Sequence, residues 1–325
     1  MTRKRTLLMY AAIVLASLVV ALLGSELVIR GITYSTGDGS GRGARRWAAE
    51  HWVPVNAEGF RDVAWDLSGR HPALVFLGDS FTDGHGVAFE ETAHHHVRTA
   101  LDGRLTAFNL GRSGESTRTE AAIYDDFRTR TGVTPEVVVW QYFGNDMQDL
   151  LPPAPEWKPW PGLEAAAGVS ELAELAWVYM AGVRWGRLYA EHHMQGYEDP
   201  RVFARHRADL AKLAGRLHAD GARIVWLAYP FLDDDAFMRR SGETYIARLH
   251  ALFAARCRAG DAFIDATPLA RTLPLPERTV NRLDGHPSPR LHRDVADRVL
   301  AAIDGRSDDA VERCARAPAP GPGHG

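Results

Sequence analysis

Cysteine is nearly absent from this chain of 325 residues, which contains only Cys257 and Cys314. Two cysteines so far apart do not match the paired ligand spacing of a structural zinc site. Neither has a neighbouring base that would favour a nucleophilic thiolate. We expect two unrelated free thiols, and a disulfide between them is the alternative if the protein is exported.

The sequence also lacks the motifs of several ligand-binding classes. It contains no phosphate loop, no cofactor fingerprint and no zinc spacing, so we expect neither a cofactor nor a metal. The net charge of −3, without a basic motif with interleaved aromatics, gives no reason to expect nucleic acid as a partner. Three consecutive histidines at 94–96 fan out around a helix and cannot chelate one ion together. We expect them on a solvated helix face, and His292 at the surface.

A long apolar run near the N-terminus is the first strong feature that the sequence does have. Between Leu7 and Ile29 the only charged residue is Glu26, and about 23 residues suffice to cross roughly 30 Å of hydrocarbon. A secretory signal usually has a shorter apolar core and a small-residue cleavage site, and no clean Ala-x-Ala follows here. We therefore predict an uncleaved membrane anchor within residues 1–30, with a cleaved signal sequence as the alternative.

After the anchor, the chain alternates between apolar strand-like runs and helical stretches. This alternation predicts an α/β fold with a parallel sheet that is covered on both faces. The expected strands are 73–77, 106–110, 136–143, 223–229 and 261–265, and the expected helices are about 88–102, 117–130, 201–219, 242–258 and 290–303.

The predicted domain at 71–304 is flanked and interrupted by segments of different composition. Residues 31–70 form a linker and lead-in segment, of which 31–48 is rich in Gly, Ser and Arg and is expected to be flexible. The last residues, 305–325, are expected to be a disordered tail. An insertion at 151–200 is rich in proline and aromatic residues. Core packing is its default role, with pocket lining and membrane contact as alternatives.

Four polar motifs, three of them directly after predicted strands, indicate where chemistry could occur. The carboxyl ends of parallel strands meet at one edge of a sheet, which is where ligands of such sheets bind. A serine at a strand-to-helix turn presents its hydroxyl beside the positive end of a helix, as nucleophilic acyl transfer requires. The motifs are Gly78-Asp79-Ser80-Phe81, Asn109-Leu110-Gly111-Arg112-Ser113-Gly114, Gly144-Asn145-Asp146 and Asp284-Gly285-His286-Pro287.

These motifs, in this order, resemble the four blocks of the SGNH (GDSL) hydrolase family, named for a serine, a glycine, an asparagine and a histidine. The resemblance covers roughly residues 71 to 304, most of the soluble part, and implies a flavodoxin-like three-layer α/β/α sandwich. It implies Ser80 as the nucleophile, His286 as the general base and Asp284 as the acid that orients the base. The implied oxyanion hole consists of the N–H groups of Ser80 and Gly114 and the side-chain amide of Asn145.

Two of the motifs depart from the family pattern. The third block usually reads Gly-x-Asn-Asp, whereas here Tyr142 stands at the usual glycine position and Gly144 directly precedes Asn145. The last block usually has its acid three residues before the histidine. Here Leu283 occupies that position, and Asp284 stands two residues before the histidine. The shortened spacing keeps open the alternative of a non-catalytic scaffold protein.

The resemblance implies a membrane-anchored serine esterase that removes an acyl group, such as acetyl, from a glycan or another envelope molecule. An O-acyltransferase that uses the same acyl-serine, and a lysophospholipase or lipid esterase, are the enzymatic alternatives. Arg3, Lys4 and Arg5 precede the apolar run and favour a cytoplasmic N-terminus. With the family's usual location, this predicts a single pass through a bacterial-type inner membrane and an extracytoplasmic catalytic domain.

Overall fold

The computed structural model describes residues 3–154 and 160–315, and its centre is a six-stranded sheet in the order β2-β1-β3-β4-β5-β8. The first five strands in this order are parallel, and β8 pairs antiparallel with β5. The strands are β1 (Ala73–Leu77), β2 (Thr106–Asn109), β3 (Pro135–Tyr142), β4 (Arg223–Ala228), β5 (Ala262–Asp265) and β8 (Val311–Arg313).

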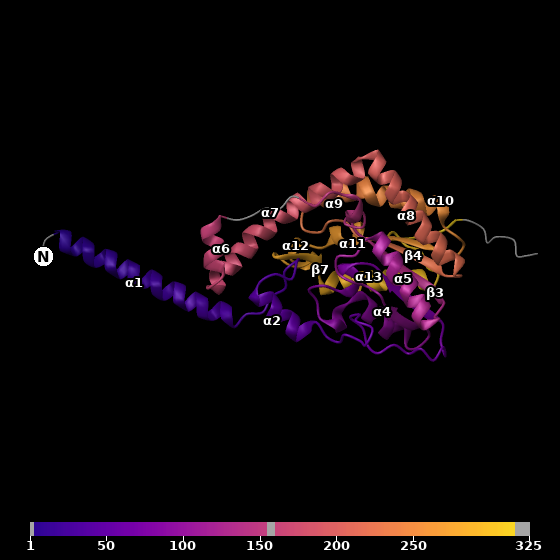
Figure 1. Ribbon diagram of the computed structural model, residues 1–325, viewed down its shortest axis with the longest axis horizontal. Helices are drawn as coiled ribbons and strands as arrows, with labels where there is room; N and C mark the ends of the chain where they lie inside the picture. The colour runs from indigo at the N-terminus through magenta and orange to yellow at the C-terminus, as the bar shows by residue number, and fades with distance from the viewer. Residues whose placement is uncertain (1–2, 155–159, 316–325) are drawn as a thin grey trace, which may run out of the picture.

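Helices cover both faces of this sheet and bury most of the residues of its five parallel strands. On one face α13 contacts β4, β5, β8 and α4, and on the other α8 contacts β4, α5 and α10. Because both faces are covered, the parallel strands are nearly continuous apolar runs. This arrangement is the predicted three-layer α/β/α sandwich, shown in Figure 1. The helices of these layers are α4 (Ala93–Leu101), α5 (Thr117–Thr131), α8 (Pro200–Ala219), α10 (Ala247–Arg256) and α13 (Pro289–Ile303).

Several short helices and a two-stranded hairpin lie in the connections that follow the strands. They are the one-turn helix α3 (Ser80–Asp83), the helices α9 (Asp235–Ser241), α11 (Thr267–Thr272) and α12 (Leu275–Arg278), and the two-stranded hairpin of β6 (Thr279–Asn281) and β7 (Asp284–Pro287). The hairpin is antiparallel and separate from the main sheet. It carries two of the predicted site residues to the edge at which β1 ends.

The N-terminal helix α1 (Arg3–Arg30) projects from the rest of the protein, as Figure 1 shows. It is long and apolar enough to cross a membrane, and none of its most apolar window is buried. A signal sequence has the same properties, so the helix by itself supports either role.

The segment after α1 is more ordered than its composition predicts. Residues 31–48 were expected to be flexible, but α2 (Arg42–His51) forms within and beyond them. Its Arg42 guanidinium lies 2.8 Å from Glu171, and Arg46 contacts the same carboxylate. The expectation of flexibility was wrong because these ion pairs join residues that are distant in sequence.

The insertion forms two helices, and the second of them contacts both α1 and the domain. They are α6 (Pro161–Ala167) and α7 (Glu171–Glu198), and residues 155–159 lie outside the described part. Near the end of α1, the Glu26 carboxylate accepts hydrogen bonds from Ser170 Oγ and from the backbone N–H groups of Glu171 and Leu172. The free N–H groups at the start of α7 are thus satisfied by α1. Farther along α7, Met194 and Tyr197 pack in the hydrophobic core.

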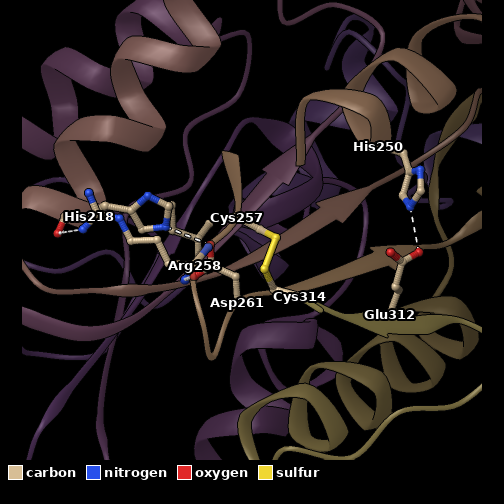
Figure 2. The surroundings of a disulfide bond; sticks show 8 residues. His218, His250, Cys257, Arg258, Asp261, Glu312 and Cys314 are labelled. Atoms are coloured by element: carbon tan, nitrogen blue, oxygen red, sulfur yellow. Dashed lines mark hydrogen bonds and ion pairs between the residues drawn. A yellow bond between two sulfur atoms is a disulfide. The ribbon is translucent and has the colours of Figure 1, made fainter. Parts of the chain in front are cut away.

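The two cysteines form a disulfide, which corrects the expectation of free thiols. Cys257 follows α10 and Cys314 follows β8, with their Cα atoms 5.8 Å apart. Figure 2 shows this bond beside Asp261, whose backbone carbonyl accepts the Cys314 N–H at 3.0 Å. The disordered tail predicted from 305 onward was therefore wrong for β8 and Cys314. Residues 316–325 lie outside the described residues.

Two histidines expected to be exposed are instead buried: His94 of α4 lies against Phe76 of β1, and His292 of α13 lies against α4. His94 and His292 are 1% and 0% exposed. His292 Nδ1 accepts the Ala93 N–H at 3.3 Å, and Asn109 contacts the His94 ring. Burial lowers the pKa of both imidazoles, so they pack as neutral rings. The helix contact, which the local sequence does not reveal, explains the difference.

Candidate active site

Ser80 begins α3 immediately after β1, as the strand-to-turn pattern predicts. The Asp79 side chain caps the helix by accepting the Phe81 N–H at 2.9 Å. Gly78 lies against Thr82 and the Gln141 side chain so closely that a Cβ there would collide with both. The sharp turn leaves the Ser80 hydroxyl near the sheet edge, with the residue 8% exposed.

The hairpin of β6 and β7 brings Asp284 and His286 to this serine. His286 Nε2 lies 2.8 Å from Ser80 Oγ, and its Nδ1 lies 2.6 Å from Asp284 Oδ1. The same Asp284 oxygen also accepts the backbone N–H of His286 at 3.1 Å. The two-residue spacing thus lets one carboxylate oxygen hold both the backbone and the ring of the histidine. A hydrogen-bonded chain from acid to imidazole to hydroxyl results.

The charges of Asp284 and His286 stabilise one another. Burial would lower the pKa of His286, but the Asp284 carboxylate and its hydrogen bond outweigh burial and raise that pKa. Burial opposes ionisation of Asp284 as well, yet the charge and hydrogen bond of His286 lower its pKa to about 2. Asp284 is therefore an anion at neutral pH, and it favours the protonated form of the imidazole.

Asn145 follows β3 and is 5% exposed, at the same sheet edge as Ser80. Its side-chain amide lies beside Asp79 and Tyr189. Burial raises the pKa of both groups, and a hydrogen bond from Asn145 opposes each increase. Its Oδ1 has no hydrogen-bond partner in the described residues. The adjacent Gly144 lies against Phe231, since a Cβ there would come within 2.6 Å of the ring.

Tyr142, which stands where the family usually has a glycine, packs in the interior of the protein. Tyr142 ends β3 and is fully buried, and its hydroxyl lies 2.6 Å from both Tyr197 Oη and His206 Nε2. This network ties the central strand to α7 and α8. Tyr142 therefore serves packing, and Asn145 follows shortly after the end of β3.

Gly114 lies in the turn after β2, with φ +80 and no heavy atom within 4 Å of where a Cβ would lie. A side chain there would be strained by the backbone rather than by crowding. Ser113 Oγ donates to Asp83 Oδ2 at 2.7 Å, which holds this turn against the end of α3. Ser80, Gly114 and Asn145 therefore lie at the ends of the adjacent strands β1, β2 and β3.

Four buried carboxyl groups surround the strand ends beneath Ser80. Burial raises the pKa of Asp83 to about 7 and that of Glu120 to about 8, and it raises those of Asp79 and Asp146 as well. Glu120 accepts a hydrogen bond from Trp140 Nε1 at 3.0 Å, and Asp146 accepts one from the Phe143 N–H at 2.6 Å. Protonation lowers the cost of burying such groups.

Two residues that the sequence did not assign to the site also contact it. Ser35 Oγ donates to Asp284 Oδ2 at 2.5 Å, and the His85 ring lies 4.5 Å from the His286 ring. His85 follows the nucleophile motif closely, whereas no local signal points to Ser35, which is 249 positions from its partner.

The ligand atoms of His85, Asp284 and His286 lie within 4.8 Å of one another, a spacing that a metal ion could bridge. Both nitrogens of His286 and both oxygens of Asp284 already have hydrogen-bond partners in the protein. We therefore interpret the group as a hydrogen-bonded acid–base chain.

Solved structures with similar folds include enzymes that act on esters. An acetylxylan esterase from Geobacillus stearothermophilus is 17% identical, with a TM-score of 0.45 over 71% of this chain and 94% of the other. The esterase EstA from Pseudoalteromonas is 12% identical, with a TM-score of 0.41 over 72% and 97%. Similarity at this level identifies no substrate, and no curated protein matched the chain.

The family comparison is more decisive because it covers more than half of the chain. Residues 76–293 match the model of the GDSL-like lipase/acylhydrolase family. This range includes all four motifs and runs from β1 into α13. The chain therefore belongs to the GDSL-like lipase/acylhydrolase family of ester-hydrolysing enzymes.

Proposed function

We propose that this protein is a membrane-anchored serine esterase that removes acyl groups, such as acetyl, from a glycan or another envelope molecule. The observation that carries the proposal is the hydrogen-bonded chain from Asp284 through His286 to Ser80. A serine hydroxyl is a poor nucleophile until a base takes its proton. Here His286 is the base, and Asp284 is the acid that orients it.

In the proposed reaction, Ser80 Oγ attacks the ester carbonyl carbon while its proton passes to His286 Nε2. The tetrahedral intermediate collapses, and His286 returns the proton to the departing alcohol oxygen. Water then attacks the acyl-serine and gives its proton to His286. The second tetrahedral intermediate collapses to the carboxylic acid, and His286 passes the proton to the departing Ser80 Oγ. Asp284 stabilises the imidazolium in both halves of the cycle and remains ionised throughout.

The negative oxygen of each tetrahedral intermediate needs donors that are in place before the reaction. The Ser80 N–H lies in the first turn of α3, where no intrahelical acceptor exists. We assign the other two donors to the Gly114 N–H and the Asn145 amide. Removal of one such donor typically costs about 3 kcal/mol of transition-state stabilisation.

The proposed location is a bacterial-type inner membrane, with α1 as the single span and the catalytic domain outside the cytoplasm. The apolar, unburied surface of α1 supports the anchor. The disulfide between Cys257 and Cys314 supports an oxidising compartment, because such bonds are rare in the cytosol.

Hydrolysis of p-nitrophenyl acetate and longer-chain esters by the full-length protein and by Ser80→Ala tests the proposal. We expect Ser80→Ala to lose at least about a thousandfold in rate and to resist a fluorophosphonate label. Full activity in Ser80→Ala would refute it. Labelling of the unaltered protein without hydrolysis would instead indicate a transferase that needs its acceptor alcohol, and neither labelling nor hydrolysis would indicate a scaffold.

A further inference from the structure

The segment between α1 and α2, residues 31–41, packs against the hairpin that carries the acid and the base. Ser35 and Thr36 within it are buried, at 3% and 1% exposed. Asn281 Nδ2 donates to the Ser35 carbonyl at 3.1 Å. The Gly37 N–H donates to the Leu283 carbonyl at 3.0 Å. Hydrogen bonds at Ser35 and Gly37 therefore fix this segment to β6 and to the residue before β7.

Ser35 supplies the second hydrogen bond of the buried acid. Its hydroxyl donates to Asp284 Oδ2, while Oδ1 of the same carboxylate is held by His286. Asp284 is 1% exposed, so water does not replace a missing donor freely. Gly86, with φ +85, makes room on the other side, since a Cβ there would lie 2.6 Å from Oδ2.

The same segment also holds the ring that packs beside the base. The Thr36 carbonyl accepts a hydrogen bond from His85 Nε2 at 2.8 Å, which places the proton of that ring on Nε2. The His85 ring then packs against His286 with its centroid 4.5 Å away. Two consecutive residues of the segment thus contact the acid directly and the base through His85.

From these contacts we infer that residues 35–37 are a working part of the active site and that Ser35 is a positioning residue for Asp284. The inference rests on the proposed function. With the acid only two residues before the base, the hairpin orients one carboxylate oxygen, and the Ser35 hydroxyl fixes the other. The carboxylate plane, and with it the direction of the bond to His286, is then determined at both ends.

This inference also links the site to the anchor. Ser35 comes five positions after Arg30, the last residue of α1. Five residues span at most about 17 Å, which limits the distance from the end of α1 to Ser35. Asp284 lies one hydrogen bond beyond Ser35. The ester to be cleaved must therefore reach a site close to the membrane-side end of the domain.

The first test measures hydrolysis of p-nitrophenyl acetate by the full-length protein in detergent micelles. We expect Ser35→Ala to lower kcat by roughly tenfold to a hundredfold, the usual effect of removing a hydrogen bond to a charged group, and to leave KM within about twofold. Ser40→Ala is the matched control, since among the described residues Ser40 forms hydrogen bonds only through its backbone. We expect it to retain the wild-type kcat.

A double-mutant cycle separates positioning of the acid from general packing. In an Asp284→Ala background, Ser35→Ala is expected to cause no further loss of kcat, because its partner is already absent. Losses that multiply would overturn the inference, as would a wild-type kcat in Ser35→Ala. Thermal unfolding of each variant identifies a change due to misfolding. Loss of activity in Ser80→Ala with none in Ser35→Ala rejects this inference alone, whereas full activity in Ser80→Ala rejects the proposed function as well.

Discussion

At the scale of single residues, the balance of charge between Asp284 and His286 sets the pH dependence of the proposed reaction. The base must be neutral to accept the Ser80 proton, and the carboxylate raises the pKa of His286 above its usual 6.5. We therefore predict that kcat/KM increases with pH and reaches half its plateau above about pH 6.5.

The acid itself can be tested in the same profile. Asp284→Asn removes the charge that raises the pKa of His286, so the midpoint is expected to shift to lower pH. Because the imidazolium also loses its stabilising partner, we expect kcat to fall by about three to four orders of magnitude. Both quantities come from pH-dependent ester hydrolysis. An unchanged midpoint would contradict the assignment of the acid.

The buried carboxyl group of Glu120 predicts a pH dependence of stability. Its pKa rises from an ordinary 4.5 to about 8 in the folded protein, because burial favours the neutral form. The folded state then binds more protons than the unfolded state, so the free energy of unfolding falls as pH increases between about 4.5 and about 8. We expect the unfolding temperature to fall by roughly 5 °C across this range.

Glu120→Gln is the variant that identifies this group, since Gln keeps an oxygen acceptor for Trp140. We expect it to flatten the pH dependence of the unfolding temperature in part, because Asp83 and Asp146 retain raised pKa values. The exposed Glu243, changed to Gln, is the control and is expected to leave the profile as it is. Identical slopes for all three proteins would contradict the assignment.

At the scale of elements, the disulfide joins the end of the edge strand β8 to the end of α10. Cys257 and Cys314 close a loop with a sequence separation of 57, and restricting such a loop in the unfolded chain contributes about 4 kcal/mol. We predict that Cys257→Ser with Cys314→Ser lowers the free energy of unfolding by about 2 to 4 kcal/mol, measured by denaturant titration. The strands β1, β2 and β3, which carry the site, are separated from β8 by β4 and β5. We therefore expect kcat to stay within about twofold of the wild-type value.

At the scale of the whole molecule, the proposed role of α1 as a membrane anchor has a direct test. We predict that the full-length protein stays in the membrane fraction after alkaline carbonate extraction and that its N-terminal residues are retained on mass measurement. A protein that begins at residue 31 is expected to be released while keeping Ser35. Loss of the first 30 residues from the mature protein would identify a cleaved signal sequence instead.

The sequence by itself determined the parallel sheet and the placement of the candidate site at the carboxyl ends of its strands. Apolar runs such as 73–77 and 136–143 predict strands because local burial and periodicity are encoded in consecutive residues, and the observed β1 and β3 match these to within one residue. Ser80, Gly114 and Asn145 follow three such strands directly. Parallel strands end at one edge, so their convergence there could be predicted from chain order alone.

Only the tertiary structure decided which distant residues meet. The pairing of Cys257 with Cys314, the burial of His292 against α4, and the contact of Ser35 with Asp284 each depend on how complete elements pack. A hydrogen bond or disulfide between residues tens to hundreds of positions apart leaves no periodic trace in either local sequence. Such contacts form only when the sheet and its helices have fixed the relative positions of the elements, and for that reason the acid's second partner was found in the fold.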